Sequence, residues 1–173
     1  PAYSTSKSGY FSSVEVATVL NYLRVCDNPR QEIPYVAVLY SPIVGCTDLE
    51  LAMIRCHSPD LPIYEASAAY EARGEEATLR EKLRFFSRQL RDIQSIVSHT
   101  PVYRVIQRIL SMTGYRSYAA AMPGGEQREA NLDMLVEKAV DFEATSYHGL
   151  FHFVRYIEEL AKYQVDCGEV HLY

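Results

Sequence analysis

The spacing of apolar residues constrains this chain more than any other feature, because it is helical along most of the length. Between residues 75 and 97 the steps between apolar residues are four, three, four, three and four, at Leu79, Leu83, Phe86, Leu90, Ile93 and Val97. Such steps put one stripe of side chains on an α-helix and are typical of a helix that packs against another. The pattern predicts a long helix over 75–97.

Similar spacing and helix-start signals predict the remaining elements. Ser12 with Glu15 and Thr47 with Glu50 have the spacing of capping boxes, and Thr100 precedes a proline at the first position of a helix. The sequence therefore predicts an all-α fold, a single domain of seven to nine helices with a short extended N-terminal segment at 1–5. Besides 75–97, the expected helices are 12–26, 33–40, 47–56, 63–72, 101–114, 126–143 and 148–163.

Composition excludes several classes of protein. The chain has 173 residues, 48% of them hydrophobic and 23% charged, as in an ordinary globular domain. Its longest apolar run, Tyr35 to Tyr40, is far below the roughly twenty residues of a membrane span. The four cysteines lack zinc-site spacing and are expected to be free thiols. The start has no signal peptide and no initiator Met, so we expect a piece of a longer protein.

The net charge of −5 conceals a basic centre. Residues 73–116 carry nine Lys or Arg and four Asp or Glu, whereas both flanking parts are acidic. One hypothesis is that this centre neutralises nucleic-acid phosphates. The alternative is a solvated helix with Glu76–Arg80 and Glu81–Arg84 pairs. The candidate residues are Arg80, Arg84, Arg88 and Arg91 on one helix face, with Lys82 outside it, and an Arg104–Arg108 pair on the next helix.

The turn at 41–47 is a second candidate phosphate contact. Gly45 and Cys46 come directly before a helix that Thr47 caps. A glycine followed at once by a capped helix is expected to leave several backbone N–H groups pointing outward, which suits a phosphate. The alternative is a plain joint between two helices.

No pattern specifies an active site. The sequence has no phosphate loop, dinucleotide-binding glycine motif or nucleophile elbow. The glycines at 124 and 125 open a helix, whose N-terminus could hold an anion. A plain loop is the favoured interpretation. His148 and His152 have the spacing of metal ligands on one helix face, but a solvated stripe with Arg155 and Glu159 is favoured. We predict no catalytic residue and no metal site.

Five segments, in order and at matching separations, carry a resemblance to a known family. Together with their surroundings, about residues 1–165, they resemble the A subunits (AddA, or RexA) of bacterial ATP-dependent helicase/nucleases, which belong with the UvrD/RecB-like superfamily 1A DNA helicases. The segments are 8–25 (SGYFSSVEVATVLNYLRV), 27–34 (DNPRQEIP), 41–45 (SPIVG), 123–132 (PGGEQREANL) and 142–158 (FEATSYHGLFHFVRYIE).

The resemblance implies the accessory 2B subdomain of such a helicase. Residues 1–11 would lead in from subdomain 2A, 12–165 would form the helical body, and 166–173 would lead back. The whole protein would use ATP and Mg²⁺ to move 3′→5′ on DNA and resect double-strand breaks for recombinational repair, in the bacterial cytoplasm. The motor and nuclease motifs lie outside this stretch, so the piece itself is expected to be non-catalytic and without cofactor.

Partners and site residues also follow from the resemblance. The domain would contact duplex DNA ahead of the fork, or alternatively pack against its partner protein AddB and its own motor domains without touching DNA. Residues 42–48 match the family's P-x-x-G-I-G-D turn, which touches the duplex, although Thr47 replaces the second glycine. Phe11 and Glu15 match an interdomain packing signature, and Glu126, Arg128 and Asn131 match a buried structural network.

Overall fold

The computed structural model describes residues 8–169, which form helices joined by turns and short connections, with no strand among them. Nine helices in this range, α2 to α10, are longer than one turn, which confirms the predicted all-α domain. The extended segment expected at 1–5 lies outside the described residues. The elements are α1 (Ser8–Phe11), α2 (Val14–Asp27), α3 (Glu32–Tyr40), α4 (Asp48–His57), α5 (Ile63–Arg73), α6 (Ala77–Ile96), the 3-10 helix η1 (Val97–His99), α7 (Val102–Thr113), α8 (Tyr115–Ala121), α9 (Gly125–Phe142) and α10 (Leu150–Glu169).

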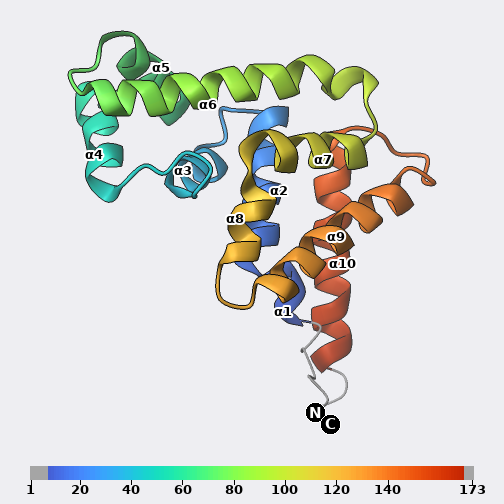
Figure 1. The fold of residues 1–173 in the computed structure, drawn as a ribbon. Helices are drawn as coiled ribbons and strands as arrows, with labels where there is room; N and C mark the ends of the chain where they lie inside the picture. The colour runs from blue at the N-terminus through green and yellow to red at the C-terminus, as the bar shows by residue number, and fades with distance from the viewer. Residues whose placement is uncertain (1–7, 170–173) are drawn as a thin grey trace.

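Helix α2 joins two groups of helices into one body. On one side it contacts α3, and α3, α4, α5 and the N-terminal half of α6 form one lobe. On the other side it contacts α9 and α10, which pack with α7 and α8 into a second lobe. Helix α6 runs along the top of both lobes, and α1 lies beside the C-terminal part of α10 (Figure 1). In the part of the chain described, no helix is long and apolar enough to cross a membrane.

The apolar stripe predicted on the longest helix is the core side of α6. Leu79, Leu83, Phe86, Leu90 and Ile93 are all at most 5% exposed. The ring of Phe86 meets those of Tyr22 and Tyr35 edge-on, with centroids 6.0 and 5.7 Å apart. Each such large apolar side chain stabilises the fold by roughly 1.5–3 kcal/mol through burial.

Several helix ends differ from the expected ones. The capping box of Thr47 and Glu50 is confirmed, but the one predicted at Ser12 is wrong, because Ser13 is the N-cap and Glu15 turns into the interior. Pro101 rather than Thr100 is the N-cap of α7. Helix α8 was not predicted, and α10 continues beyond 165 to Glu169.

Candidate nucleic-acid interface

The basic stripe of α6 is exposed over three of its four arginines. Arg84, Arg88 and Arg91 lie on the solvent side, and within residues 8–169 none of them forms an ion pair. The alternative pairs of Glu76 with Arg80 and Glu81 with Arg84 do not form in this range either. The three guanidinium groups are therefore available to an external anion.

Arg80 is in a different environment from the other three. It is half-buried, and its Nη1 donates to the carbonyl oxygens of Gly74 at 2.6 Å and Glu75 at 3.2 Å. These bonds tie the α5–α6 connection to the first turn of α6. Arg80 thus serves local structure, and the exposed stripe is shorter than the spacing alone indicated.

The arginine pair on α7 is also exposed. Arg104 and Arg108 lie opposite the buried Val105, Ile106 and Ile109, and the Arg104 guanidinium sits 5.6 Å from the ring centroid of Tyr103. Helix α7 packs on α6, α8 and α9. Both arginines are therefore free to meet solvent or a partner.

The turn before α4 does not offer the backbone donors expected of it. The N–H groups of Val44 and Gly45 donate to the carbonyl of Ser41 at 3.2 and 2.7 Å, and that of Cys46 donates to Leu39 at 2.9 Å. Thr47 N–H donates to the Glu50 carboxylate at 3.1 Å. The N–H groups at 44–47 therefore do not point outward, because the turn and its capping box use these donors internally.

The side chains of the turn divide between interior and surface. Cys46 is 3% exposed, and burial raises the pKa of its thiol to about 11, so it stays protonated at neutral pH. Gly45 adopts φ +75, a left-handed conformation that favours glycine, and nothing lies within 4 Å of where a Cβ would be. Thr47 is exposed, and its hydroxyl accepts from Glu50 N–H while keeping a proton to donate.

Lys82 lies outside the predicted arginine stripe, and its side chain connects the turn to α6. Its Nζ donates to the Gly45 carbonyl at 3.0 Å and to Glu50 Oε1 at 2.7 Å. Burial raises the pKa of Glu50, but the hydrogen bonds from Lys82 and Thr47 outweigh it and leave that pKa lowered. Lys82 projects about 160° around the helix from Arg84, at about 100° per residue. The turn and the arginine stripe therefore face different directions.

A buried carboxylate links α2 to α9. Glu15 is 2% exposed; its Oε2 accepts from Arg128 Nη1 at 2.9 Å, and its Oε1 accepts from Asn131 Nδ2 at 2.7 Å. Asn131 accepts from Gln127 at 2.9 Å, and Arg128 Nε donates to the Pro123 carbonyl at 3.0 Å. Glu15 belongs to one family signature and Arg128 and Asn131 to another. In the structure the three side chains form one hydrogen-bonded network.

Two further residues of those signatures lie outside this network. Glu126 is exposed, so its expected place in a buried network is wrong. Phe11 is partly buried against the core and meets the ring of Tyr10 edge-on, with Lys138 Nζ 5.8 Å from the Phe11 centroid. Both observations leave Glu15, Arg128 and Asn131 as the polar link within the domain.

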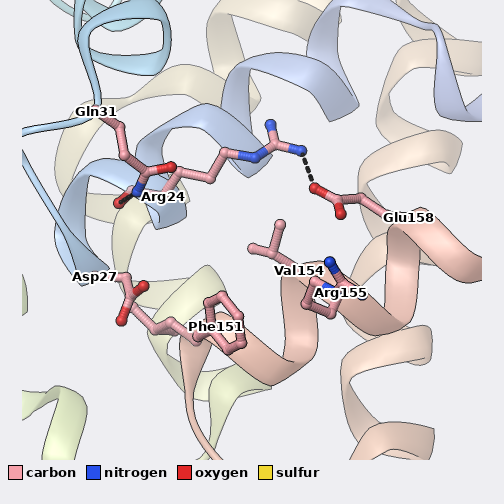
Figure 2. A pocket seen from close by; sticks show the side chains of 8 residues that line it. Arg24, Asp27, Gln31, Phe151, Val154, Arg155 and Glu158 are labelled. Atoms are coloured by element: carbon pink, nitrogen blue, oxygen red, sulfur yellow. Dashed lines mark hydrogen bonds and ion pairs between the residues drawn. The ribbon is translucent and has the colours of Figure 1, made fainter.

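A small pocket between α2 and α10 was not predicted. Arg24 reaches from α2 to Glu158 on α10, with 3.0 Å between Nη2 and Oε1, and Val154 and Phe151 lie below this pair (Figure 2).

His148 precedes α10, because Gly149 takes φ +91 and the helix begins at Leu150. His148 and His152 therefore do not share a helix face. Within the described residues, no three His, Cys, Asp or Glu side chains are grouped to hold a metal ion.

Comparison with known proteins gives many relatives over nearly the whole chain. The A subunit of the ATP-dependent helicase/nuclease of Bacillus velezensis is 45% identical over 97% of this chain, that of Bacillus licheniformis 40% over 97%, and that of Lachnoclostridium phytofermentans 38% over 98%. The chain spans only 14%, 14% and 16% of those proteins, respectively. No protein-family model matches the chain. The resemblance drawn from the motifs is confirmed: the chain is a relative of one segment of the A subunits of ATP-dependent helicase/nucleases.

Proposed function

We propose that this chain is the accessory 2B domain of an AddA-type ATP-dependent helicase/nuclease, and that it holds duplex DNA through the arginine stripe of α6. The observation that carries the proposal is the exposure of Arg84, Arg88 and Arg91 without ion-pair partners in the described range. Arginines left unpaired on a chain of net charge −5 are suited to phosphate contacts, because they release counterions on binding. Arg104 and Arg108 would extend the contact along the duplex.

The turn at Gly45, Cys46 and Thr47 is assigned a smaller part. Its N–H groups at 44–47 are used internally, and Asp48 beside it is exposed and repels phosphate. The open space above Gly45 and the Thr47 hydroxyl allow one close contact. The arginines would therefore supply most of the affinity, and the turn would add position.

The rest of the function belongs to the longer protein. ATP and Mg²⁺ would bind to motor domains outside this chain, whose own sequence has no phosphate loop. The domain would be non-catalytic and would work in the bacterial cytoplasm with an AddB-type partner protein. The side-by-side position of α1 and the end of α10 suits a domain inserted in a motor, because the chain would enter and leave at one end (Figure 1).

Titration of a labelled, tailed duplex tests the DNA contact. With three phosphates neutralised, affinity should fall roughly 500-fold between 20 and 200 mM salt. The R84Q/R88Q variant should lower both the affinity and this salt dependence. The matched control is R155Q/K162Q, which removes the same charge from exposed positions on α10 and should bind as the unchanged chain does. Equal losses in the two variants would refute a specific stripe.

The alternative is a domain that packs against AddB or the motor without touching DNA. It predicts that R84E/R88E leaves DNA binding of the whole complex intact and weakens its assembly. Measuring both quantities on the same complex separates the two functions.

A further inference from the structure

Three aromatic side chains form an exposed cluster at the start of α10. Tyr147 and Phe151 are 61% and 56% exposed, and the ring of His152 lies 5.3 Å from the centroid of each. Burying such rings against a partner would remove apolar surface from water, so a contiguous exposed group of them is typical of an interaction site. We call Tyr147, Phe151 and His152 the α10 aromatic cluster.

Two hollows meet at Phe151, one of the three residues of this cluster. The first is the pocket between α2 and α10, about 70 Å³, with Leu150 and Val154 among its lining residues. The second is a wider groove of about 560 Å³, lined by parts of η1, the start of α7 and the α9–α10 connection. Asp27, Leu150 and Phe151 line both, and Figure 2 shows Phe151 and Asp27 together at the edge of the smaller one.

The size of the smaller pocket limits what enters it. An enclosed apolar cavity of about 150 Å³ binds benzene. At about 70 Å³, the α2–α10 pocket is smaller than that and suits a small branched aliphatic side chain better than an aromatic ring. Leu150, Phe151 and Val154 form the apolar part of an otherwise polar and charged lining, and they are suited to such a side chain.

The charges around the hollows also oppose nucleic acid. Arg24 is held by Glu158 at 3.0 Å, and Arg155 lies 3.9 Å from Glu159. Asp27 is exposed and forms no ion pair with any residue between 8 and 169. The unneutralised charge at the junction of the hollows is therefore negative, which attracts a Lys or Arg side chain and repels phosphate.

We propose that the α10 aromatic cluster and its two hollows dock a segment of the same polypeptide outside these 173 residues, through one branched aliphatic side chain and one nearby Lys or Arg. The relatives are roughly seven to eight times as long as this chain, so in a protein of that length most of the polypeptide would lie outside it. The cluster and pocket are small beside the roughly 800 Å² per partner of a stable complex between separate proteins. A tethered segment needs far less contact, because its effective concentration is about millimolar.

The inference rests on the proposal that the chain is one domain of a longer protein, and it does not depend on DNA binding. Overlapping peptides of about 15 residues, tiling the rest of the longer polypeptide, are titrated with the 173-residue chain by fluorescence anisotropy. We expect at least one peptide with the stated side chains to bind the unchanged chain. Its affinity for F151A should be at least tenfold lower, and its affinity for D27K several-fold lower. The matched control is F85A, because Phe85 is 61% exposed on α6, and it should change binding less than twofold.

Several outcomes would overturn the proposal. These are no peptide bound below 1 mM, or equal losses in F151A and F85A. Tighter binding by peptides of AddB, or self-association of the chain that F151A abolishes, would assign the cluster to another occupant. A loss of tailed-duplex affinity in F151A would assign it to nucleic acid. R84Q/R88Q should bind the peptide normally, so a failure of the DNA proposal is distinguishable from a failure of this one.

Discussion

Glu15 is a charged residue in a buried position. A carboxylate that is only 2% exposed must have its charge compensated inside the protein. Arg128 and Asn131 supply that compensation from another helix, more than 110 positions away in sequence. Removing one partner of a buried charge pair typically costs 3–5 kcal/mol, since the other charge is left unpaired. The link between α2 and α9 therefore depends on all three side chains together.

Replacing Glu15 with glutamine tests this link. A glutamine presents N–H groups where the carboxylate accepts two hydrogen bonds, so we expect a loss of about 1–3 kcal/mol in the free energy of unfolding. The same change at the exposed Glu126 should stay within about 0.5 kcal/mol. Urea unfolding followed by circular dichroism measures both. A similar loss in the two variants would mean that the resemblance, which groups Glu126 with the network, describes it better than the structure does.

Residue types and spacing predicted part of the Glu15 network and of the Lys82 contacts, and not the rest. The E-x-R-x-x-N-L signature pointed to a network, but nothing local to Glu15 indicated that its partners stand on α9, since they are brought together only by tertiary packing. Lys82 was set aside because it lies outside the arginine stripe, yet that same orientation takes its amine to Gly45 and Glu50. Helical spacing predicts which side chains share a face, and it does not say what that face meets.

At the scale of elements, the joint between α3, α4 and α6 depends on one ionised group. Glu50 caps α4 with Thr47 and accepts from Lys82 of α6 at 2.7 Å. Its pKa in the folded chain is lowered from the ordinary 4.5, so the folded state holds the ionised form more tightly than the unfolded state does. The stabilisation is therefore complete above 4.5 and is lost as the pH falls through the lowered pKa.

Replacing Glu50 with glutamine isolates this charge, because glutamine also serves in a capping box. We expect E50Q to be less stable by about 1 kcal/mol at pH 7, and the difference to shrink below pH 4.5 as the unchanged chain loses its own charge. The control is E81Q, at an exposed position of α6, which should show no such trend. Urea titrations at several pH values give the comparison, and a difference that grows in acid would contradict the assignment.

Helices of nine or more residues were predictable, whereas the seven-residue α8 and several helix ends were not. The stripe of α6 spans enough turns for its period to be recognised, whereas α8 has seven residues and lies below the window in which periodicity is informative. Gly114 at φ +69 both ends α7 and opens α8, so one glycine marks two boundaries. The last helix was expected to begin at His148, but it begins at Leu150, because Gly149 at φ +91 breaks the continuity.

For the whole molecule, the two proposed contacts differ in the sign of their charge. The unpaired arginines lie on α6, which runs along the top of the molecule (Figure 1), and Asp27 and Phe151 line the pocket between α2 and α10. One surface suits phosphate and the other suits a basic protein segment. A domain with two such surfaces can hold DNA and remain attached to its own polypeptide at once.

Both surfaces keep a fixed relation only if the two lobes act as one rigid unit, and α2 is the element that joins the lobes. Leu23 is fully buried on α2, which contacts helices of both lobes. We expect L23A to lower the free energy of unfolding by about 2–5 kcal/mol and to shift a single cooperative transition, because both lobes lose the same support. L49A, at a position 70% exposed on α4, should change it by less than about 0.5 kcal/mol. Far-ultraviolet circular dichroism and tyrosine fluorescence should give the same midpoint for each variant. Two separated transitions, with only one moved by L23A, would mean that the lobes unfold independently and that their surfaces are not held in a fixed relation.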